Sequence, residues 1–271
     1  MTEGDRPAPR RAKPGLIDAT VPNAARAADF LHGGKGHFAA DREAVRAVTA
    51  SVPAVERIPA EARAFRHRTV RYLVAEAGIR QFLDIGNGLV PPGTTHEVAQ
   101  SVDQRCRIVY TDSDPLVLTR AQSLIKSAPG GAVSCVEGDI ADVDAILAAA
   151  VPTLDLSQPV GVLLLSTLAH VPTMIAAARA VSSLMAAVPS GSHTVIYHLA
   201  SDLDPAMPAA ARHWNKTVPV PITLRSRDEV LTLVSGLEVA APGVVPVTGW
   251  RSEQRPPAEP VPLHGVVARK P

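Results

Sequence analysis

Residues 81–88 read Gln-Phe-Leu-Asp-Ile-Gly-Asn-Gly, and this stretch decides the fold class. The mostly apolar run 81–85 predicts a short strand buried on both faces, as in a parallel sheet. The glycines that follow predict a turn in which the backbone can approach a ligand closely, because no Cβ stands in the way. The stretch therefore predicts the first strand of an open α/β sheet with a binding loop at its carboxyl end.

Apolar strands and helices alternate downstream of this stretch. Strands are predicted over 107–111, 132–136, 160–165 and 192–199, and helices over 94–102, 115–126, 144–150 and 174–188. The alternation predicts right-handed βαβ units, whose strands all end at one edge of a parallel sheet. Late strands are predicted over 237–239 and 263–268, and a helix over 226–233 that starts with a capping box of Ser226 and Glu229. Residues 201–221, which contain Trp214 and several prolines, are expected to be irregular.

The segment before the first strand is predicted to be helical. Residues 22–50 form helices interrupted by a glycine loop at 32–37, and a third helix spans 60–77. The arginines of that third helix are expected on a solvated face; they are Arg63, Arg66, Arg68 and Arg71. The predicted organisation is a disordered tail over 1–15, a helical lid over 16–60 and a Rossmann-like core over 61–271.

Composition narrows the class of protein. The net charge is +1, and no basic stripe of a nucleic-acid binder is present. Apolar residues make up 46% of the chain and aromatic residues 3%, which favours a globular Ala/Val/Leu-rich core. The two cysteines, Cys106 and Cys135, are interpreted as reduced core residues. With no export signal or membrane-spanning run, a cytoplasmic protein that binds neither membrane nor nucleic acid is expected.

The predicted binding loop after the first strand carries the strongest chemical signal. Asp84, Gly86, Asn87 and Gly88 form the pattern D-x-G-x-G, whereas the dinucleotide fingerprint G-x-G-x-x-G fails at Pro91. D-x-G-x-G is typical of loops that accommodate S-adenosylmethionine. The alternative interpretation is a tight strand-to-helix turn without a ligand.

Two further acids follow successive predicted strands. Asp112 ends the second strand and is expected to accept hydrogen bonds from ribose hydroxyls, with Ser113 beside it; Asp114 is the rival acid. Asp139 follows the third strand and is expected to meet an adenine amine, while Ile140 packs on the ring. Read without a ligand, these acids only cap helices and turns.

The fourth predicted strand is followed by Ser166 and His170, at the same sheet edge. Ser166 is a candidate cofactor contact. His170 is the candidate general base, because an imidazole titrates near neutral pH; shaping the pocket is the alternative role. No metal site is expected, since His32 and His37 flank the glycine loop without an acidic or cysteine cluster at ligand spacing.

Longer strings resemble a bacterial family of S-adenosylmethionine-dependent methyltransferases catalogued as a domain of unknown function. The resemblance covers about residues 17–270 and is carried by the strings at 30–35, 38–43, 71–73, 78–86, 95–100, 109–115 and 225–227. It implies a class I fold with a seven-stranded sheet whose last strand is antiparallel, and helices at the N-terminus that cover the cofactor cleft. It also implies that Asp84, Gly86, Gly88, Asp112 and Asp139 bind the cofactor and that Arg63 reaches its carboxylate.

The predicted function is methyl transfer from S-adenosylmethionine to an unidentified small molecule. The alternative is a protein that binds S-adenosylmethionine or S-adenosylhomocysteine without methyl transfer, acting through partners or catalysing another reaction. A homodimer is compatible with the sequence, but no apolar stripe identifies an interface.

Overall fold

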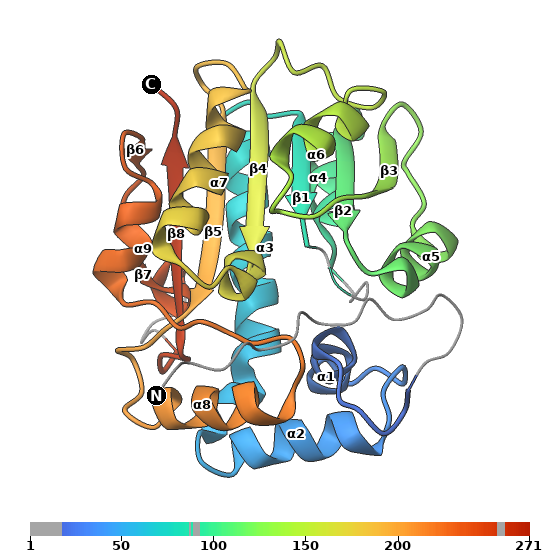
Figure 1. The fold of residues 1–271 in the computed structure, drawn as a ribbon. Coiled ribbons are helices and arrows are strands. Elements are labelled where there is room, and N and C mark those ends of the chain that lie inside the picture. The colour runs from blue at the N-terminus through green and yellow to red at the C-terminus, as the bar shows by residue number, and fades with distance from the viewer. Residues whose placement is uncertain (1–17, 87, 89–92, 254–257) are drawn as a thin grey trace, which may run out of the picture.

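The central feature of the molecule is a twisted sheet (Figure 1). The computed structural model describes residues 18–86, 88, 93–253 and 258–271. In the described chain the strands are β1 (Gln81–Ile85), β2 (Arg107–Asp112), β3 (Ala132–Glu137), β4 (Val160–Leu165), β5 (His193–Leu199), β6 (Glu238–Val239), β7 (Val245–Pro246) and β8 (Leu263–Arg269). Their order is β3-β2-β1-β4-β5-β8-β6, and β7 pairs with β8.

Strands β1 to β5 run parallel, and β8 is antiparallel to β5. The parallel sheet and the antiparallel last strand were both predicted. The expected count of seven strands was wrong by one, because the short strand β7 adds an eighth. A two-residue strand that includes a proline carries no alternating pattern that a sequence could reveal.

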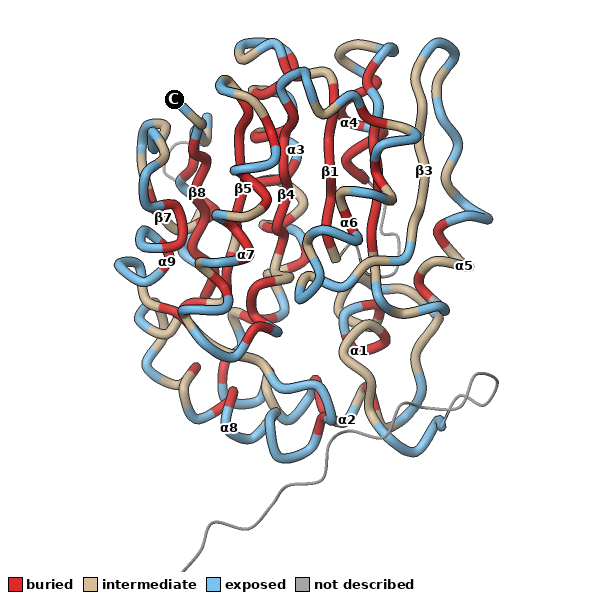
Figure 2. The backbone as a smooth tube through the Cα atoms, turned by 45° about the horizontal axis from the view of Figure 1, so that its top comes forward, coloured by how far each residue is buried: buried red, intermediate tan, exposed pale blue. Residues whose placement is uncertain are grey.

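Helices cover both faces of the sheet. Helices α3 (Ile58–Ala75) and α4 (Thr95–Val102) pack on one face in a cluster that includes Phe65, Val98 and Trp250. Helices α6 (Val143–Ala150), α7 (Met174–Ala186) and α9 (Arg227–Leu233) pack on the other face, around Ile146, Val181 and Val230. Helix α5 (Pro115–Leu124) lies beside β2 and β3. Figure 2 shows the resulting pattern, with buried residues concentrated in the central strands.

A further group of helices lies beyond the carboxyl ends of the parallel strands (Figure 1). It contains α1 (Ala24–Leu31), α2 (Ala39–Thr49) and α8 (Met207–Thr217), and the short 3₁₀ turn η1 (Pro53–Arg57) follows α2. We call these elements the helical layer. Val52, Val55, Met207 and Ala210 form its buried apolar centre, so the N-terminal helices and α8 pack as one unit.

Helix α8 corrects the expectation that residues 201–221 are irregular. Pro208 lies in the first turn of α8, where its missing N–H costs nothing. Met207, Ala210 and Ala211 then form a buried face at helical spacing. The prolines indicated a break in structure, whereas in this segment one of them begins a helix.

A buried carboxylate joins α1 to α2. Asp41 accepts hydrogen bonds from the backbone N–H groups of Asn23 and Phe38, each at 2.8 Å. It also accepts one at 2.8 Å from the guanidinium of Arg26. Asp41, in the first turn of α2, therefore also fixes the angle between two helices of the helical layer. Within the described residues, no helix combines the length and apolarity needed to cross a membrane.

Candidate functional site

The predicted binding loop leaves β1 at the carboxyl edge of the sheet. Gly86 and Gly88 both adopt positive φ values, 73° and 65°, which favour glycine. The Gly86 N–H donates to the Thr111 carbonyl at 2.8 Å, and a Cβ on Gly86 would collide with the side chain of Thr167. Asn87, a predicted cofactor contact, lies outside the described residues. The loop is therefore held tightly against its neighbours at Gly86.

Asp84 is buried directly below this loop. Its carboxylate accepts a hydrogen bond at 2.6 Å from the hydroxyl of Thr95, the first residue of α4. Burial raises the pKa of Asp84, while the Thr95 hydrogen bond and the charge of Arg66 act in the opposite direction. The predicted first acid of the motif is thus a buried group that links the end of β1 to the start of α4.

The second predicted acid, Asp112, contacts the binding loop. Its carboxylate accepts hydrogen bonds from the N–H of Gly88 and the N–H of Asp114, both at 2.9 Å. Burial raises the pKa of Asp112. The rival acid Asp114 receives at its backbone carbonyl the N–H of Leu118 in α5. Asp112 therefore lies beside the binding loop, and Ser113 next to it is exposed. The choice of Asp112 over Asp114 as the ribose acid stays a prediction.

The third predicted acid lies further along the same edge. Asp139 is exposed, and its carboxylate accepts a hydrogen bond at 2.9 Å from the N–H of Ala141. Ile140 is half-buried and packs against the core on the α6 and α7 face. Asp139 thus closes a turn while its carboxylate remains accessible to solvent. The roles assigned to Asp139 and Ile140 stay predictions.

The arginines of α3 correct the expectation of one solvated face. Arg66 is buried, and Arg68 donates to the carbonyls of Trp250 at 2.8 Å and Val247 at 2.6 Å. The Nε atoms of Arg63 and Arg66 are buried without a hydrogen-bond partner among the described residues. A Cβ on Gly93, which follows the binding loop, would lie 3.3 Å from the Arg63 side chain. The C-terminal segment therefore covers Arg68 and the chain at Gly93 lies against Arg63, on a helix that was expected to present its arginines to solvent.

His32 is a site residue that the sequence analysis considered only as a metal ligand. It follows α1, and its Nδ1 atom is buried without a partner in the described part of the chain. Burial lowers the pKa of His32 to about 4, and the charges of Arg66 and Arg63 act in the same direction. His32 is therefore neutral at pH 7. The signal for it was its position at the start of the glycine loop 32–37.

The 3₁₀ turn η2 (Thr167–His170) follows β4; Ser166 comes directly before it and His170 is its last residue. Ser166 adopts a left-handed conformation with φ 72°, which is unusual for a residue with a Cβ. His170 is exposed, and its Nδ1 lies 3.2 Å from the Pro221 carbonyl. The two residues lie on the same cavity, so the structure brings them together. A catalytic role for His170 stays a prediction.

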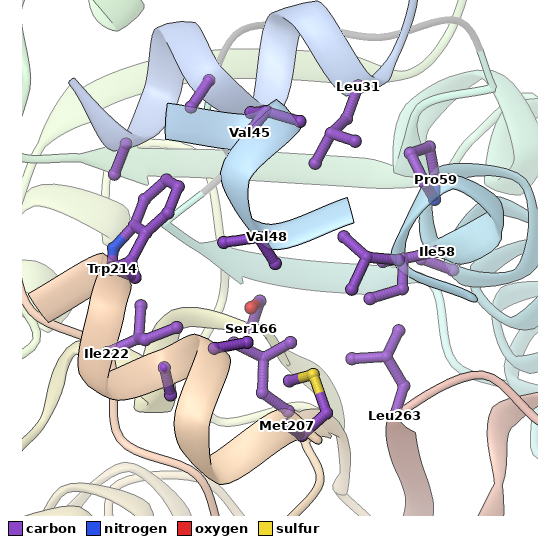
Figure 3. Close-up of a pocket in the computed structure, with 18 of the residues that line it drawn as sticks. Leu31, Val45, Val48, Ile58, Pro59, Ser166, Met207, Trp214, Ile222 and Leu263 are labelled. Atoms are coloured by element: carbon purple, nitrogen blue, oxygen red, sulfur yellow. The ribbon is translucent and has the colours of Figure 1, made fainter. Parts of the chain in front are cut away.

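That cavity, of about 220 Å³, lies between the sheet edge and the helical layer. Figure 3 shows side chains from both parts pointing into it. The residues that line it are Ala24, Ala27, Ala28, Leu31, His32, Val45, Val48, Val55, Ile58, Pro59, Ala62, Ser166, His170, Tyr197, Leu199, Met207, Ala210, Ala211, Trp214, Ile222 and Leu263. We call it the lid cavity. Among the residues the structure describes, no group of three or more histidine, cysteine or acidic side chains could hold a metal ion.

The fold and the edge site place the chain among the Rossmann-like class I methyltransferases. An O-methyltransferase family 2 protein from Planctomyces limnophilus shares the fold with a TM-score of 0.50 at 16% identity, over 86% of this chain and 62% of that chain. Residues 10–271 match the S-adenosyl methyltransferase family, and this chain belongs to that family. The resemblance inferred from the sequence strings is confirmed, and the cofactor is S-adenosylmethionine.

Two further solved structures share more of the sequence of this chain. A DUF574 family protein from Streptomyces avermitilis is 36% identical with a TM-score of 0.89, over 94% of this chain and all of that chain (100%). A protein from Thermobifida fusca, named as a candidate methyltransferase, is 32% identical with a TM-score of 0.84, over 93% of this chain and 96% of that chain. Among curated proteins, none matches this sequence.

The residues at the edge fit S-adenosylmethionine. The two unpartnered Nε atoms of Arg63 and Arg66 offer donors to a carboxylate. A Cβ on Gly88 would meet nothing within 4 Å, so the backbone there is open to a ligand. Asp112 offers carboxylate oxygens next to Gly88. Donors for a carboxylate, open backbone and a carboxylate acceptor are the groups that S-adenosylmethionine requires.

Proposed function

We propose that this protein transfers the methyl group of S-adenosylmethionine to a small molecule bound in the lid cavity. One observation carries the proposal. Ser166 lines the lid cavity, and the next residue, Thr167, donates to the Ile85 carbonyl and lies where a Cβ on Gly86 of the binding loop would collide with it. The candidate cofactor site and the cavity are therefore neighbours, as a direct transfer between two bound molecules requires.

The residues of the chain contribute position and orientation. When bound, S-adenosylmethionine supplies an electrophilic methyl group on its sulfonium. In the proposal, Arg63 and Arg66 hold the carboxylate, Asp112 holds the ribose hydroxyls, and Asp139 meets the adenine amine. Ser166 lies where the binding loop and the lid cavity meet, and His170 is the candidate base for an acceptor that must lose a proton.

The setting we propose is the cytoplasm, with a small-molecule acceptor rather than a nucleic acid. The free thiols of Cys106 and Cys135 support a reducing compartment. The net charge of +1 supports an acceptor other than a polyanion.

Isothermal titration calorimetry tests the cofactor assignment. The Asp112→Ala variant should bind S-adenosylmethionine and S-adenosylhomocysteine about 1–3 kcal/mol more weakly than the unchanged protein, because charge-assisted hydrogen bonds are lost. Asp144→Ala, an exposed acid in the first turn of α6, is the matched control and should bind normally. If the two variants bind the cofactor with equal affinity, Asp112 does not contact the cofactor.

A labelling experiment tests the transfer itself. The protein is incubated with methyl-labelled S-adenosylmethionine and a small-molecule filtrate of the source cells. Label in new small molecules, together with S-adenosylhomocysteine, supports methyl transfer. Tight cofactor binding with no label transferred would overturn the proposal and favour binding without transfer.

A further inference from the structure

The lid cavity has an almost entirely apolar wall. Helix α1 contributes a stripe at helical spacing, formed by Ala24, Ala27, Ala28 and Leu31. Val45 and Val48 come from α2, and Met207 and Trp214 from α8; Figure 3 shows Val45, Val48, Met207 and Trp214 around the same space. Alanines on α1 and α8 lie among these larger side chains. A larger residue in place of one of these alanines would occupy part of the volume.

The wall contains no full charge. Among the described residues that line the lid cavity there is no aspartate, glutamate, lysine or arginine. Transferring an ionised group from water to such a wall without a partner is costly. An ammonium or carboxylate on the ligand would find no counter-charge on this wall.

Some of the hydrogen-bonding atoms on the wall are already paired. The Trp214 indole N–H donates to the Val220 carbonyl at 3.3 Å, and His170 Nδ1 lies 3.2 Å from the Pro221 carbonyl. His32 Nδ1 is buried and has no partner within the described chain. The Ser166 hydroxyl is drawn pointing into the space in Figure 3. His32, which is neutral at pH 7, is a partner for an uncharged hydrogen-bonding group.

We propose that the methyl acceptor is an uncharged, predominantly apolar molecule whose few hydrogen-bonding groups meet His32 and Ser166. This inference rests on the proposed methyl transfer, since it names the class of molecule that the same site takes. The apolar wall supplies the affinity through burial of apolar surface, and the two polar side chains orient the acceptor.

A binding experiment that needs no methyl transfer tests this class. N-phenyl-1-naphthylamine is an uncharged fluorescent amine, and 8-anilinonaphthalene-1-sulfonate is an anionic dye of similar size. Each is titrated into the full-length protein saturated with S-adenosylhomocysteine. We expect the uncharged dye to bind at least about tenfold more tightly than the anionic one. Equal or tighter binding of the anionic dye would overturn the inference.

A matched pair of variants locates the binding. Ala28→Leu adds a side chain inside the lid cavity, whereas Ala25→Leu adds the same side chain to a residue of α1 that does not line it. Ala28→Leu should weaken binding of the uncharged dye by about tenfold or more, and Ala25→Leu by less than about twofold. If Ala28→Leu does not fold, Ala24→Leu on the same stripe replaces it. Unchanged binding in the cavity variant would overturn the inference.

The labelling experiment separates this inference from the proposed function. Labelled products of an uncharged acceptor should pass into ethyl acetate at pH 7 at least as well as at pH 3 or pH 10. Products that extract better at pH 3 or pH 10 than at pH 7 carry a group that is ionised at pH 7; they would overturn the acceptor class and leave methyl transfer intact. If the dyes bind as expected but no labelled product forms, the proposed methyl transfer is contradicted and the apolar binding site is still supported.

Discussion

At the scale of single residues, Gly86 and Gly88 differ in what a side chain would meet. Both have positive φ, so alanine is strained at either position by about 1–2 kcal/mol. A Cβ at Gly86 would also collide with Thr167, whereas a Cβ at Gly88 would meet nothing within 4 Å. Gly86→Ala should therefore lower the free energy of unfolding by about 3 kcal/mol and Gly88→Ala by about 1 kcal/mol. Urea denaturation of the two variants measures this difference, and equal losses would contradict the close contact at Gly86.

His198 is a second residue with a measurable consequence. Its Nε2 lies 2.5 Å from the Arg225 guanidinium, which donates, and its Nδ1 lies 2.9 Å from the Leu199 carbonyl, which accepts. Burial lowers the pKa of His198 to about 4, and the charge of Arg225 acts in the same direction, because protonation would place a second cation against it. The unfolded chain binds this proton below about pH 6.5 and the folded chain does not, so stability falls as the pH falls from about 6.5 to 4.

We expect His198 to contribute up to about 3 kcal/mol of this loss, because a pKa difference of one between the folded and unfolded states corresponds to about 1.4 kcal/mol. His198→Gln keeps an acceptor for Arg225 but does not titrate, so its unfolding free energy should vary less between pH 6.5 and 4 than that of the unchanged protein. His213→Gln, at an exposed position on α8, is the control. Identical pH dependence in all three proteins would show that His198 is protonated as easily in the folded state as in the unfolded state.

At the scale of elements, local patterns predicted most of the structure. The capping box at Ser226 and Glu229 starts α9 as expected, and Thr94 with Glu97 starts α4 in the same way. These signals work because both partners lie within one turn. Helix α8 was missed because its buried face packs against η1 and α2, which are distant in sequence. The helix propensity of a short segment carries no information about which distant elements it packs against.

The residues of the candidate site also differ in whether the local sequence predicts them. The loop glycines and Asp112 were predictable, because they follow strands whose apolar runs are visible in the sequence. The burial of Arg66 and the unpartnered nitrogen of His32 were not, because they depend on how segments distant in sequence pack together. Ser166 was placed correctly at the sheet edge, but its left-handed backbone has no signature in a residue that is not glycine.

At the scale of the whole molecule, two parts differ in how much apolar surface holds them. The sheet is buried between two large clusters on its two faces, whereas the helical layer is centred on four fully buried side chains. A segment with few buried contacts opens at a lower free energy than the core. The layer also forms one wall of the lid cavity, so local opening of the layer would widen the way in for an acceptor.

Hydrogen exchange should reveal this difference in stability. We expect the most protected amides of α2 and α8 to exchange through local opening, at a free energy at least about 2 kcal/mol below that of β4 and β5. Val52→Ala, which removes buried methyl groups from the centre of the layer, should speed exchange in α2 and α8 and leave β4 and β5 unchanged. Val162→Ala in β4 is the matched control, because a loss in the sheet core lowers protection throughout. If Val52→Ala speeds exchange equally in the sheet and the layer, the two parts unfold as one unit, and entry to the lid cavity would need a route that leaves the layer closed.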